Sequence, residues 1–411
     1  MSEVVWPQVL LVGAGVVGRS IALDHLLAGI PVWMADRDAD MLSRSCDWVL
    51  QRSESTAESA PPWGAKVDLP IVLIRPNDHD PSFGPEVPRW LLIESIAERL
   101  DVKQAFFADA EGWFERSPIL TTNTSTLSIE KIASTMQHPE RLCGLHFFMP
   151  VVDRHAAEII SSPATDPEVV AACCRHAERL AKRPLLVRDG PGFVVNRMLS
   201  SYLNLAMWLL CGGVDEDVIG RAAIGYGMPI SPLELIDLIG PRTAFDGGRT
   251  VWQAFPTRMD PSPLLPALVK RKLTGVQGGR GFYTYSLQAS DSSHPHREGQ
   301  GITAEASELV ERYRHHDFNV GMLNADELIA LVAELFAATM HWEAAAIVRD
   351  GIADSETIGL AMREGLAWRR GRDLSSQTAS PESVLSPETL QRIAADYPLI
   401  RSVQPIPRSC S

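Results

Sequence analysis

A short apolar run that leads into three spaced glycines constrains the fold of this chain more than any other feature. Gln8 to Val12 read QVLLV, the stretch Gly13-Ala-Gly15-Val-Val-Gly18 follows, and RSIALDHLLAG then has helical spacing. This order of strand, G-x-G-x-x-G turn and helix is typical of dinucleotide-binding domains. We expect Gly13 to allow the tight turn, Gly15 to let a pyrophosphate approach the backbone, and Gly18 to let the helix lie close to the strand.

An acidic residue at the end of the next apolar run indicates which dinucleotide is bound. Pro31 to Ala35 predicts a second strand, and Asp36 follows it. A carboxylate there accepts hydrogen bonds from the ribose of NAD and repels the 2′-phosphate of NADP, although the adjacent Arg37 weakens that preference. The alternative is a chance glycine-rich turn with a surface aspartate. With the N-terminal residues of the helix, the predicted cofactor contacts here are Gly13, Gly15, Val16, Val17, Gly18, Asp36 and Arg37.

Predicted strands and helices alternate as far as residue 189. The apolar runs include VDLPIVLI at 67–74, WLLI at 90–93, PILTT at 118–122 and RPLLVRD at 183–189. Helical stretches separate them. This pattern predicts an α/β fold, in which a doubly wound, Rossmann-type NAD-binding domain with a parallel sheet spans residues 1–189.

The chain changes character after residue 190. The apolar segment MLSSYLNLAMWLL at 198–210 belongs to a predicted buried helix of about twenty residues. Further predicted helices follow it, so we expect an all-α domain over 190–285. Residues 286–301 are polar and rich in Ser, which predicts a linker. His294 and His296 lie within it, and we prefer a solvated loop to a metal-binding tract. No metal site is predicted.

The predicted helical part of the sequence contains an internal repeat. DEDVIG at 215–220 returns as DSETIG at 354–359, and each copy follows a long apolar helix. The second copy has no counterpart of Pro191-Gly192-Phe193 or of Asn196-Arg197. We therefore interpret residues 302–400 as a second, degenerate helical repeat with a structural role. Residues 372–387 are polar, and we expect them to be mobile.

Charge and cysteine content bear on the partners and the compartment. The net charge of −13 argues against a nucleic-acid partner. Six cysteines without a C-x-x-C pair fit reduced thiols in a cytoplasm. The N-terminus lacks the pattern of a signal peptide, and no segment is long enough to span a bilayer. We therefore expect a cytoplasmic protein with no membrane partner.

A histidine within an apolar run is the candidate for chemistry. His146 stands in GLHFFMP at 144–150, and Glu158 comes twelve residues later before a second apolar pair. Two neighbouring strands can place this pair side by side, and a buried imidazole held by a carboxylate is a suitable general base near neutral pH. A lone histidine in an apolar strand is more often a hydrogen-bonded core residue, which is the alternative.

Several motifs together resemble the L-3-hydroxyacyl-CoA dehydrogenase family. They occur in the family's order between about residues 8 and 283, and they read GAGVVG, ESIAERLDVK, TNTSTL, GLHFFMP, DGPGFVVNR, GMPISPLELID and GRGFY. The resemblance implies an oxidoreductase of fatty-acid β-oxidation that binds NAD. It implies oxidation of L-3-hydroxyacyl-CoA to 3-oxoacyl-CoA or the reverse reaction, with an acyl-CoA substrate.

The resemblance also implies roles for individual residues. His146 takes the proton of the substrate hydroxyl, and Glu158 holds its tautomer. Ser125 and Asn196 hydrogen-bond the reacting oxygen, and Glu98, Lys103 and Ser125 match positions that contact the cofactor. Each has a plain structural alternative: Ser125 as a helix cap, Asn196 bonded only to backbone, and Glu98 with Lys103 as an exposed pair on a helix.

Two departures from the family pattern leave alternatives open. Met149 stands where the family has Asn, and a thioether cannot replace an amide's hydrogen bonds near the cofactor. The charged hairpin that helps to grip CoA is replaced by a Pro-rich stretch at 53–88, although Arg44, Arg52 and Lys66 are available to meet phosphates. A dehydrogenase of a small non-thioester hydroxy acid and a non-catalytic NAD-binding homologue therefore stay open.

The helical repeat also affects the expected assembly. Relatives of this family dimerise through the helical domain. The second repeat can cover that surface within one chain, so we expect either a homodimer or a pseudo-dimeric monomer.

Overall fold

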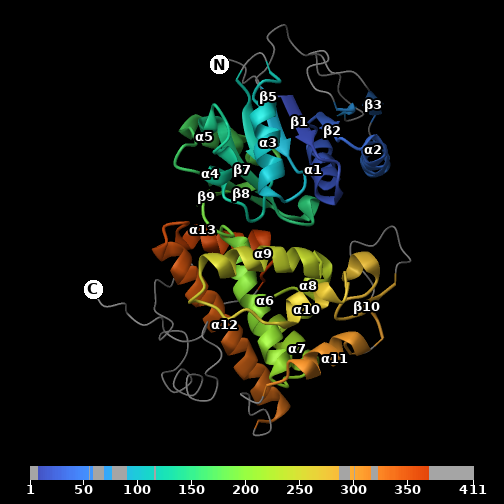
Figure 1. Cartoon of the computed structure of the whole chain (residues 1–411), viewed down its shortest axis with the longest axis vertical. Helices are drawn as coiled ribbons and strands as arrows, with labels where there is room; N and C mark the ends of the chain where they lie inside the picture. The colour runs from blue at the N-terminus through green and yellow to red at the C-terminus, as the bar shows by residue number, and fades with distance from the viewer. Residues whose placement is uncertain are drawn as a thin grey trace. The chain divides into compact units, whose positions relative to one another are not determined.

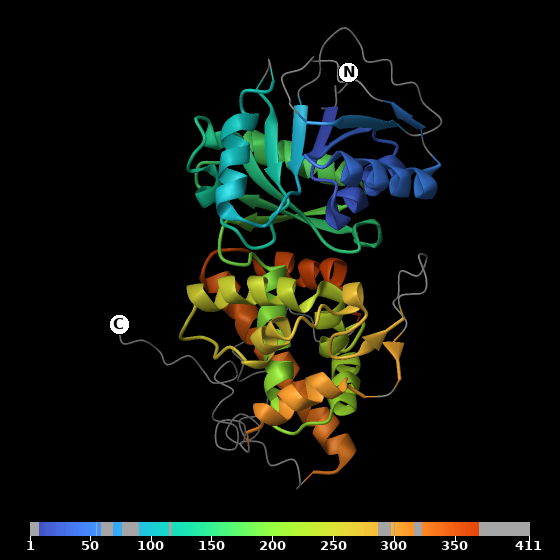
Figure 2. The ribbon, with the colours of Figure 1, turned by 45° about the vertical axis from the view of Figure 1, so that its right-hand side comes forward.

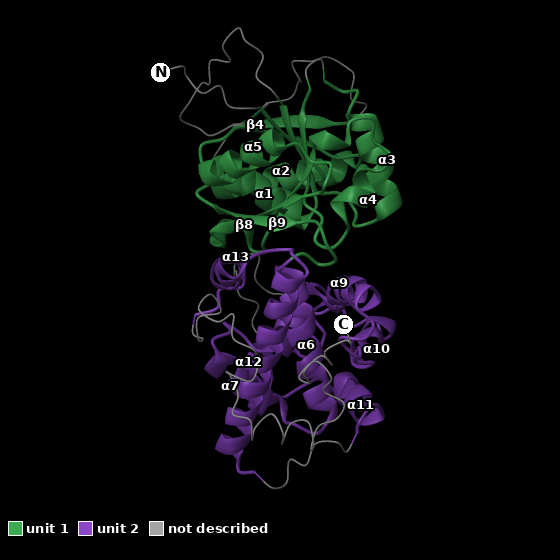
Figure 3. Ribbon diagram, turned by 90° about the vertical axis from the view of Figure 1, so that its left-hand side faces the viewer, with its two compact units in different colours: residues 1–193 green, residues 194–411 purple. Residues whose placement is uncertain are grey.

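The computed structural model divides the chain into two compact units, Met1–Phe193 and Val194–Ser411 (Figure 3). It describes residues 8–54, 56–58, 69–75, 90–114, 117–286, 297–299, 301–315 and 323–369. Lys66, His294, His296, residues 372–387 and most of the Pro-rich stretch lie outside the described residues. The division falls slightly later than the boundary expected at residues 189 and 190.

The described strands of the first unit form one sheet in the order β3-β4-β2-β1-β5-β6-β7-β8-β9 (Figure 1). The central strands β1, β2, β5, β6 and β7 come from short apolar runs and are almost wholly buried, as strands with both faces covered are. Their bounds are β1 Gln8–Val12, β2 Val32–Ala35, β3 Thr56–Glu58, β4 Ile71–Arg75, β5 Trp90–Glu94, β6 Ile119–Thr122, β7 Leu142–Phe147, β8 Ala156–Ser161 and β9 Arg183–Arg188.

The sheet is mixed, so the expectation of a wholly parallel sheet is wrong. Strands β2, β1, β5, β6 and β7 pair in parallel, whereas β2–β4, β3–β4 and β7–β8 are antiparallel. Only residues 148–155 connect β7 to β8. That is too short for the crossover of about a dozen or more residues that parallel neighbours need, and this hairpin carries His146 and Glu158.

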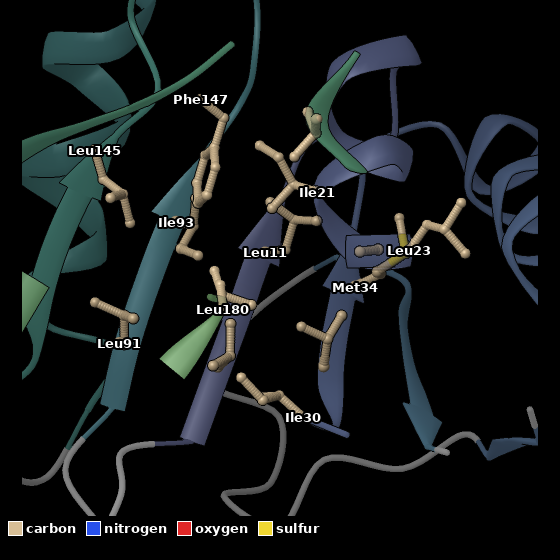
Figure 4. Packing of buried hydrophobic residues seen from close by; sticks show 14 of the residues in the cluster. Leu11, Ile21, Leu23, Ile30, Met34, Leu91, Ile93, Leu145, Phe147 and Leu180 are labelled. Atoms are coloured by element: carbon tan, nitrogen blue, oxygen red, sulfur yellow. The ribbon is translucent and has the colours of Figure 1, made fainter. Parts of the chain in front are cut away.

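Helices cover the sheet of the first unit (Figure 2), and their apolar faces complete its core. Residues from β1, β2, β5 and β7 pack with α1 and the end of α5 in one cluster, including Leu11, Ile21, Met34, Ile93, Leu145, Phe147 and Leu180 (Figure 4). Leu10 and Leu92, on the opposite face of the sheet, are also buried. The helices are α1 Val16–Leu27, α2 Ala39–Ser53, α3 Leu100–Ala110, α4 Ile129–Ala133 and α5 Pro167–Arg179.

The second unit is helical apart from a short pairing of two extended segments. Its helices are α6 Val195–Cys211, α7 Glu216–Tyr226, α8 Pro232–Ile239, α9 Pro241–Ala254, α10 Leu264–Lys270, α11 Ala304–Arg312, α12 Ala325–Arg349 and α13 Ser355–Leu360. Strand β10, Thr284–Tyr285, pairs antiparallel with β11, Arg297–Glu298. The stretch expected to be only a linker therefore contributes a strand, and the expectation of a purely helical domain needs this small correction.

The two helical repeats share a local signal. Asp215 caps α7 by accepting from the Asp217 N–H, and Asp354 caps α13 by accepting from the Thr357 N–H. Each cap follows a long apolar helix, α6 in the first repeat and α12 in the second. Helix α12 packs against both α6 and α7, so the second repeat belongs to the core of this unit.

Helix α12 also corrects the expectation that no segment is long enough to cross a membrane. By length and composition alone it is long and apolar enough. Two-thirds of its apolar window, 67%, is buried within the protein. Core helices of soluble proteins have this property, and the packing of α12 on α6 and α7 fits that explanation.

Candidate active site

The glycine turn after β1 has the steric properties that a dinucleotide site needs. Gly13 has φ +109°, and a Cβ added there would lie 2.3 Å from the Ser95 carbonyl oxygen. A Cβ on Gly18 would lie 1.8 Å from the Gly13 carbonyl oxygen, whereas one on Gly15 would meet nothing within 4 Å. Gly13 and Gly18 are therefore required by packing, and the space beside Gly15 is open to a phosphate group.

The residues around this turn also fit a nucleotide. Helix α1 has Gly15 as its N-cap with no side-chain hydrogen bond, so the first N–H groups are not satisfied by a side-chain cap. Asp36 accepts from the Ala14 N–H at 2.7 Å and from the Asp38 N–H at 2.9 Å. These bonds tie the end of β2 to the turn, and carboxylate oxygens retain further lone pairs for a ribose. Arg37 is exposed.

His146 and Glu158 face each other across the β7–β8 hairpin. The strand register pairs them directly, and the His146 Nδ1 lies 2.7 Å from the Glu158 Oε2. His146 is 7% exposed and Glu158 is fully buried. The ring also contacts Phe148 and Phe193 edge-on or tilted. A carboxylate at Nδ1 selects the tautomer that donates from this nitrogen, which leaves the lone pair of the neutral ring on Nε2.

Glu98 organises the loop that carries Ser125. One oxygen, Oε1, accepts from the Ser125 N–H at 3.0 Å, from the Thr124 hydroxyl at 2.7 Å and from the Thr126 N–H at 3.2 Å. The hydroxyl of Ser125 lies 3.3 Å from the same oxygen. Burial acts to raise the pKa of Glu98, but the Lys103 charge and these hydrogen bonds outweigh it and lower the pKa.

Two of the plain structural alternatives are wrong. Lys103 is 1% exposed and lies 2.5 Å from a Glu94 oxygen and 3.4 Å from a Glu98 oxygen, so Glu98 and Lys103 are not an exposed helical pair. Ser128, not Ser125, caps α4 by accepting from the Lys131 N–H. Ser125 and Glu98 therefore belong to one polar network beside the carboxyl ends of β5 and β6.

Glu94 was not singled out by the sequence analysis. It ends β5, is fully buried, and binds the Lys103 ammonium, the Thr122 hydroxyl and the Ile96 N–H. Burial raises its pKa despite the adjacent lysine. The available signal was an acidic residue that directly ends an apolar strand, because the carboxyl ends of parallel strands line the ligand sites of such sheets.

Met149 and Asn196 are the remaining predicted site residues. Met149 follows β7 with 44% of its surface exposed. Asn196 lies in the first turn of α6 and belongs to the second unit, whereas His146, Glu158 and Ser125 belong to the first. Among the described residues, no group of three or more His, Cys, Asp or Glu is arranged to hold a metal ion.

A mixed sheet with a glycine turn at a helix N-terminus, followed by a helical unit, defines a two-unit protein of the nucleotide-dependent dehydrogenase class. Residues 8–190 match the family described as 3-hydroxyacyl-CoA dehydrogenase, NAD binding domain, and residues 192–285 match its C-terminal domain. The chain belongs to the 3-hydroxyacyl-CoA dehydrogenase family, and its cofactor is NAD.

Individual relatives agree with this assignment. The fatty acid oxidation complex subunit alpha of Pseudomonas savastanoi pv. phaseolicola is 32% identical over 280 residues, which cover 68% of this chain but 38% of that protein. The (S)-3-hydroxybutyryl-CoA dehydrogenase of Ralstonia eutropha has a TM-score of 0.56 at 27% identity, covering 68% of this chain and 98% of its own.

One solved structure extends over both helical repeats. The 3-hydroxybutyryl-CoA dehydrogenase of Escherichia coli K12 has a TM-score of 0.68 at 24% identity, and the match covers 99% of this chain and 97% of that chain. At this identity the likeness shows the fold alone.

Proposed function

We propose that this protein catalyses the NAD-dependent interconversion of L-3-hydroxyacyl-CoA and 3-oxoacyl-CoA, a reaction of fatty-acid β-oxidation. The observation that carries the proposal is the 2.7 Å contact between the His146 Nδ1 and the buried Glu158 carboxylate. The dehydrogenase relatives named above act on 3-hydroxyacyl thioesters by their names, which supports an acyl-CoA substrate. A cytoplasmic location fits the same family and is part of the proposal.

The chemistry assigned to His146 is removal of a proton. Oxidation of a secondary alcohol to a ketone removes the hydroxyl proton and a hydride from the same carbon. NAD, when bound, supplies the acceptor for the hydride. The His146 Nε2 takes the hydroxyl proton, and Glu158 stabilises the imidazolium that results. In the reverse direction the imidazolium returns the proton to the oxygen as hydride adds to the carbonyl carbon.

The other predicted residues orient the reactants. Ser125 and Asn196 are assigned hydrogen bonds to the reacting oxygen, which fix its distance from His146. Glu98 supports Ser125 through its backbone and hydroxyl. Glu98 and Lys103 are further assigned to the cofactor side of the site, together with Met149. Residues Gly13, Gly15, Val16, Val17, Gly18, Asp36 and Arg37 are assigned to the nucleotide.

The test is a substrate panel that follows NADH absorbance. Acetoacetyl-CoA and free 3-oxo acids are each offered with NADH and with NADPH, and we expect turnover of the thioester with NADH. His146→Gln should lower kcat by about 10²-fold or more, because the base is lost while the side-chain volume is roughly kept.

The matched control is His138→Gln. His138 also pairs with a glutamate, Glu140, at 3.1 Å, but both side chains are close to half exposed. This variant should retain wild-type turnover. Preference for a free acid over the thioester would reject the substrate class, and unimpaired turnover in His146→Gln would reject the assigned base.

We also propose that the second repeat makes the protein a pseudo-dimeric monomer. Helix α12 packs on α6 and α7 of the first repeat, and these helices belong to the domain through which we expect relatives to dimerise. Light scattering coupled to size exclusion should give a mass near 45.1 kDa. A stable species of twice that mass would reject the proposal.

A further inference from the structure

A buried arginine joins the two helical repeats directly beside a predicted site residue. Arg197 follows Asn196 in the first turn of α6 and is 0% exposed. Its Nε donates to the Glu343 Oε1 at 2.6 Å, and its Nη1 donates to the Asp350 Oδ2 at 3.0 Å. Both acids lie on or directly after α12 in the second repeat.

The arginine depends on these acids for electrostatic reasons. A cation in the first turn of a helix faces the positive end of the helix dipole, and the first turn of α6 contains no acidic residue. Burying a guanidinium costs its hydration free energy, and nearby partners must offset that cost. Among the described contacts, the carboxylates that pair with Arg197 come from the second repeat.

We call the group formed by Arg197, Glu343 and Asp350 the Arg197 clamp. Neighbouring side chains fix its geometry. The guanidinium carbon of Arg197 lies 4.5 Å from the centre of the Phe255 ring. Arg258 holds Asp350 with two hydrogen bonds of 2.8 and 2.9 Å. Ser201, one turn further along α6, donates to the second oxygen of Glu343 at 3.3 Å.

We propose that Glu343 and Asp350 are positioning residues, through which the second repeat fixes the first turn of α6 and therefore Asn196. The inference rests on the proposed function only for the role of Asn196 at the reacting oxygen. One planar peptide joins Asn196 to Arg197, so a shift of the Arg197 backbone moves Asn196 with it. The degenerate repeat thus serves the site of the first repeat although it has no site residues of its own.

The experiment compares Glu343→Gln and Glu343→Asp with a matched variant on the same helix. Asp326→Asn removes another acid of α12 that faces an arginine of the first repeat, Arg221 at 3.8 Å, but that pair is exposed. For each protein we measure kcat, the KM values for acetoacetyl-CoA and NADH, the melting temperature, and hydrogen exchange of the backbone amides at 194–201.

We expect both Glu343 variants to lose kcat by about tenfold or more, since small displacements of an orienting group are costly. The KM for NADH should stay within about twofold, because the nucleotide turn lies in the other unit. Hydrogen exchange at 194–201 should be faster in both variants. Asp326→Asn should match the wild type in every measurement.

Glu343→Asp separates positioning from charge balance. It keeps the negative charge and shortens the side chain by one methylene group, so a role in charge neutralisation alone predicts wild-type kcat. That result would overturn the inference, as would a fall in melting temperature with unchanged kcat and unchanged exchange at 194–201. If Glu343→Gln fails to fold, Glu343→Asp alone decides.

The outcome is distinguishable from failure of the proposed function. A wild-type protein that turns over no thioester rejects the proposed function. Hydrogen exchange then still decides the clamp, since faster exchange at 194–201 in the Glu343 variants supports it and unchanged exchange overturns it.

Discussion

Met149 is the residue at which we expect this chain to depart most clearly from the chemistry of its family. Its side chain is 44% exposed, it directly follows the strand of His146, and the motif resemblance implies Asn at this position in the family. A thioether is only a weak acceptor and donates no hydrogen bond. An exposed position of this kind tolerates a polar side chain at little cost in stability.

Met149→Asn is therefore expected to improve the enzyme. One restored hydrogen bond to the cofactor or substrate should raise kcat/KM by about two- to tenfold. Val152→Asn is the control, because Val152 is similarly exposed nearby but has no assigned contact. Steady-state kinetics with NADH as the varied substrate measures the effect. A fall in kcat/KM for Met149→Asn would show that the thioether suits this site better than an amide.

At the scale of the element, the strand, glycine turn and helix at residues 8–27 combine two different requirements. Gly18 is needed because a Cβ would overlap the Gly13 carbonyl oxygen, and this requirement belongs to the fold. Gly15 has open space where its Cβ would lie, so its requirement belongs to the ligand. Substitutions at the two positions should therefore fail in different ways.

Gly15→Ala should fold normally and bind NAD at least about tenfold more weakly, because the methyl group occupies the space of the pyrophosphate. Gly18→Ala should lose about 3 kcal/mol or more of unfolding free energy, because backbone must move. Gly225→Ala, at another open position in α7, should keep NAD affinity and lose no unfolding free energy, because Ala is favoured over Gly in a helix. Calorimetric NAD titration and urea unfolding measure these effects. Unchanged NAD affinity in Gly15→Ala would contradict the assigned nucleotide site.

At the scale of the whole molecule, buried groups contribute to the pH dependence of stability in opposite directions. In the first unit, His25 of α1 and His176 of α5 face each other with their Nε2 atoms 2.9 Å apart, both buried. The Nδ1 of His25 lies 2.7 Å from the Ile21 carbonyl oxygen, so both rings fit as neutral tautomers. Burial lowers the pKa of His25 to about 4, and burial lowers that of His176 well below its usual value.

The sign for the histidines follows from proton uptake. Between pH 6.5 and 4 these histidines bind protons in the unfolded chain but not in the folded chain, so stability is lost as pH falls through this range. In the second unit, burial raises the pKa of Asp237 to about 6. Between pH 4 and 6 the Asp237 carboxyl is protonated in the folded state but not in the unfolded chain. The contribution of Asp237 to stability therefore falls as pH rises.

A double variant isolates the histidine contribution. Between pH 7.5 and 5.5, one histidine with the shift of His25 should cost about 1.4 kcal/mol of unfolding free energy. Over this pH interval, the unfolding free energy of the double variant His25→Leu/His176→Leu should therefore fall by about 1–3 kcal/mol less than that of the wild type. His138→Gln removes an exposed histidine and should keep the wild-type slope. Urea unfolding at both pH values measures it, and equal slopes in wild type and the double variant would contradict the neutral buried pair.

The sequence by itself determined the features that depend on neighbouring residues. Asp38 directly precedes α2 and accepts from the Met41 N–H, and such a cap is a local feature because a capping carboxylate needs only the following turn. The overlap at Gly18 was equally predictable, since it involves the carbonyl oxygen of Gly13 five residues earlier, whereas the overlap at Gly13 involves the distant Ser95 and depends on the fold. Family motifs added the pairing of His146 with Glu158, which the short hairpin enforces.

Only the tertiary structure decided the features that depend on distant partners. Lys103 sits on a helix with polar neighbours, yet Glu94 and Glu98 draw it into a buried network that sequence spacing cannot distinguish from an exposed pair. Arg197 finds Glu343 at a separation of 146 residues, and no local pattern connects them. Local sterics and helix capping act over a few residues, so they can be predicted from the sequence. Burial and charge pairing depend on which surfaces the completed fold brings together.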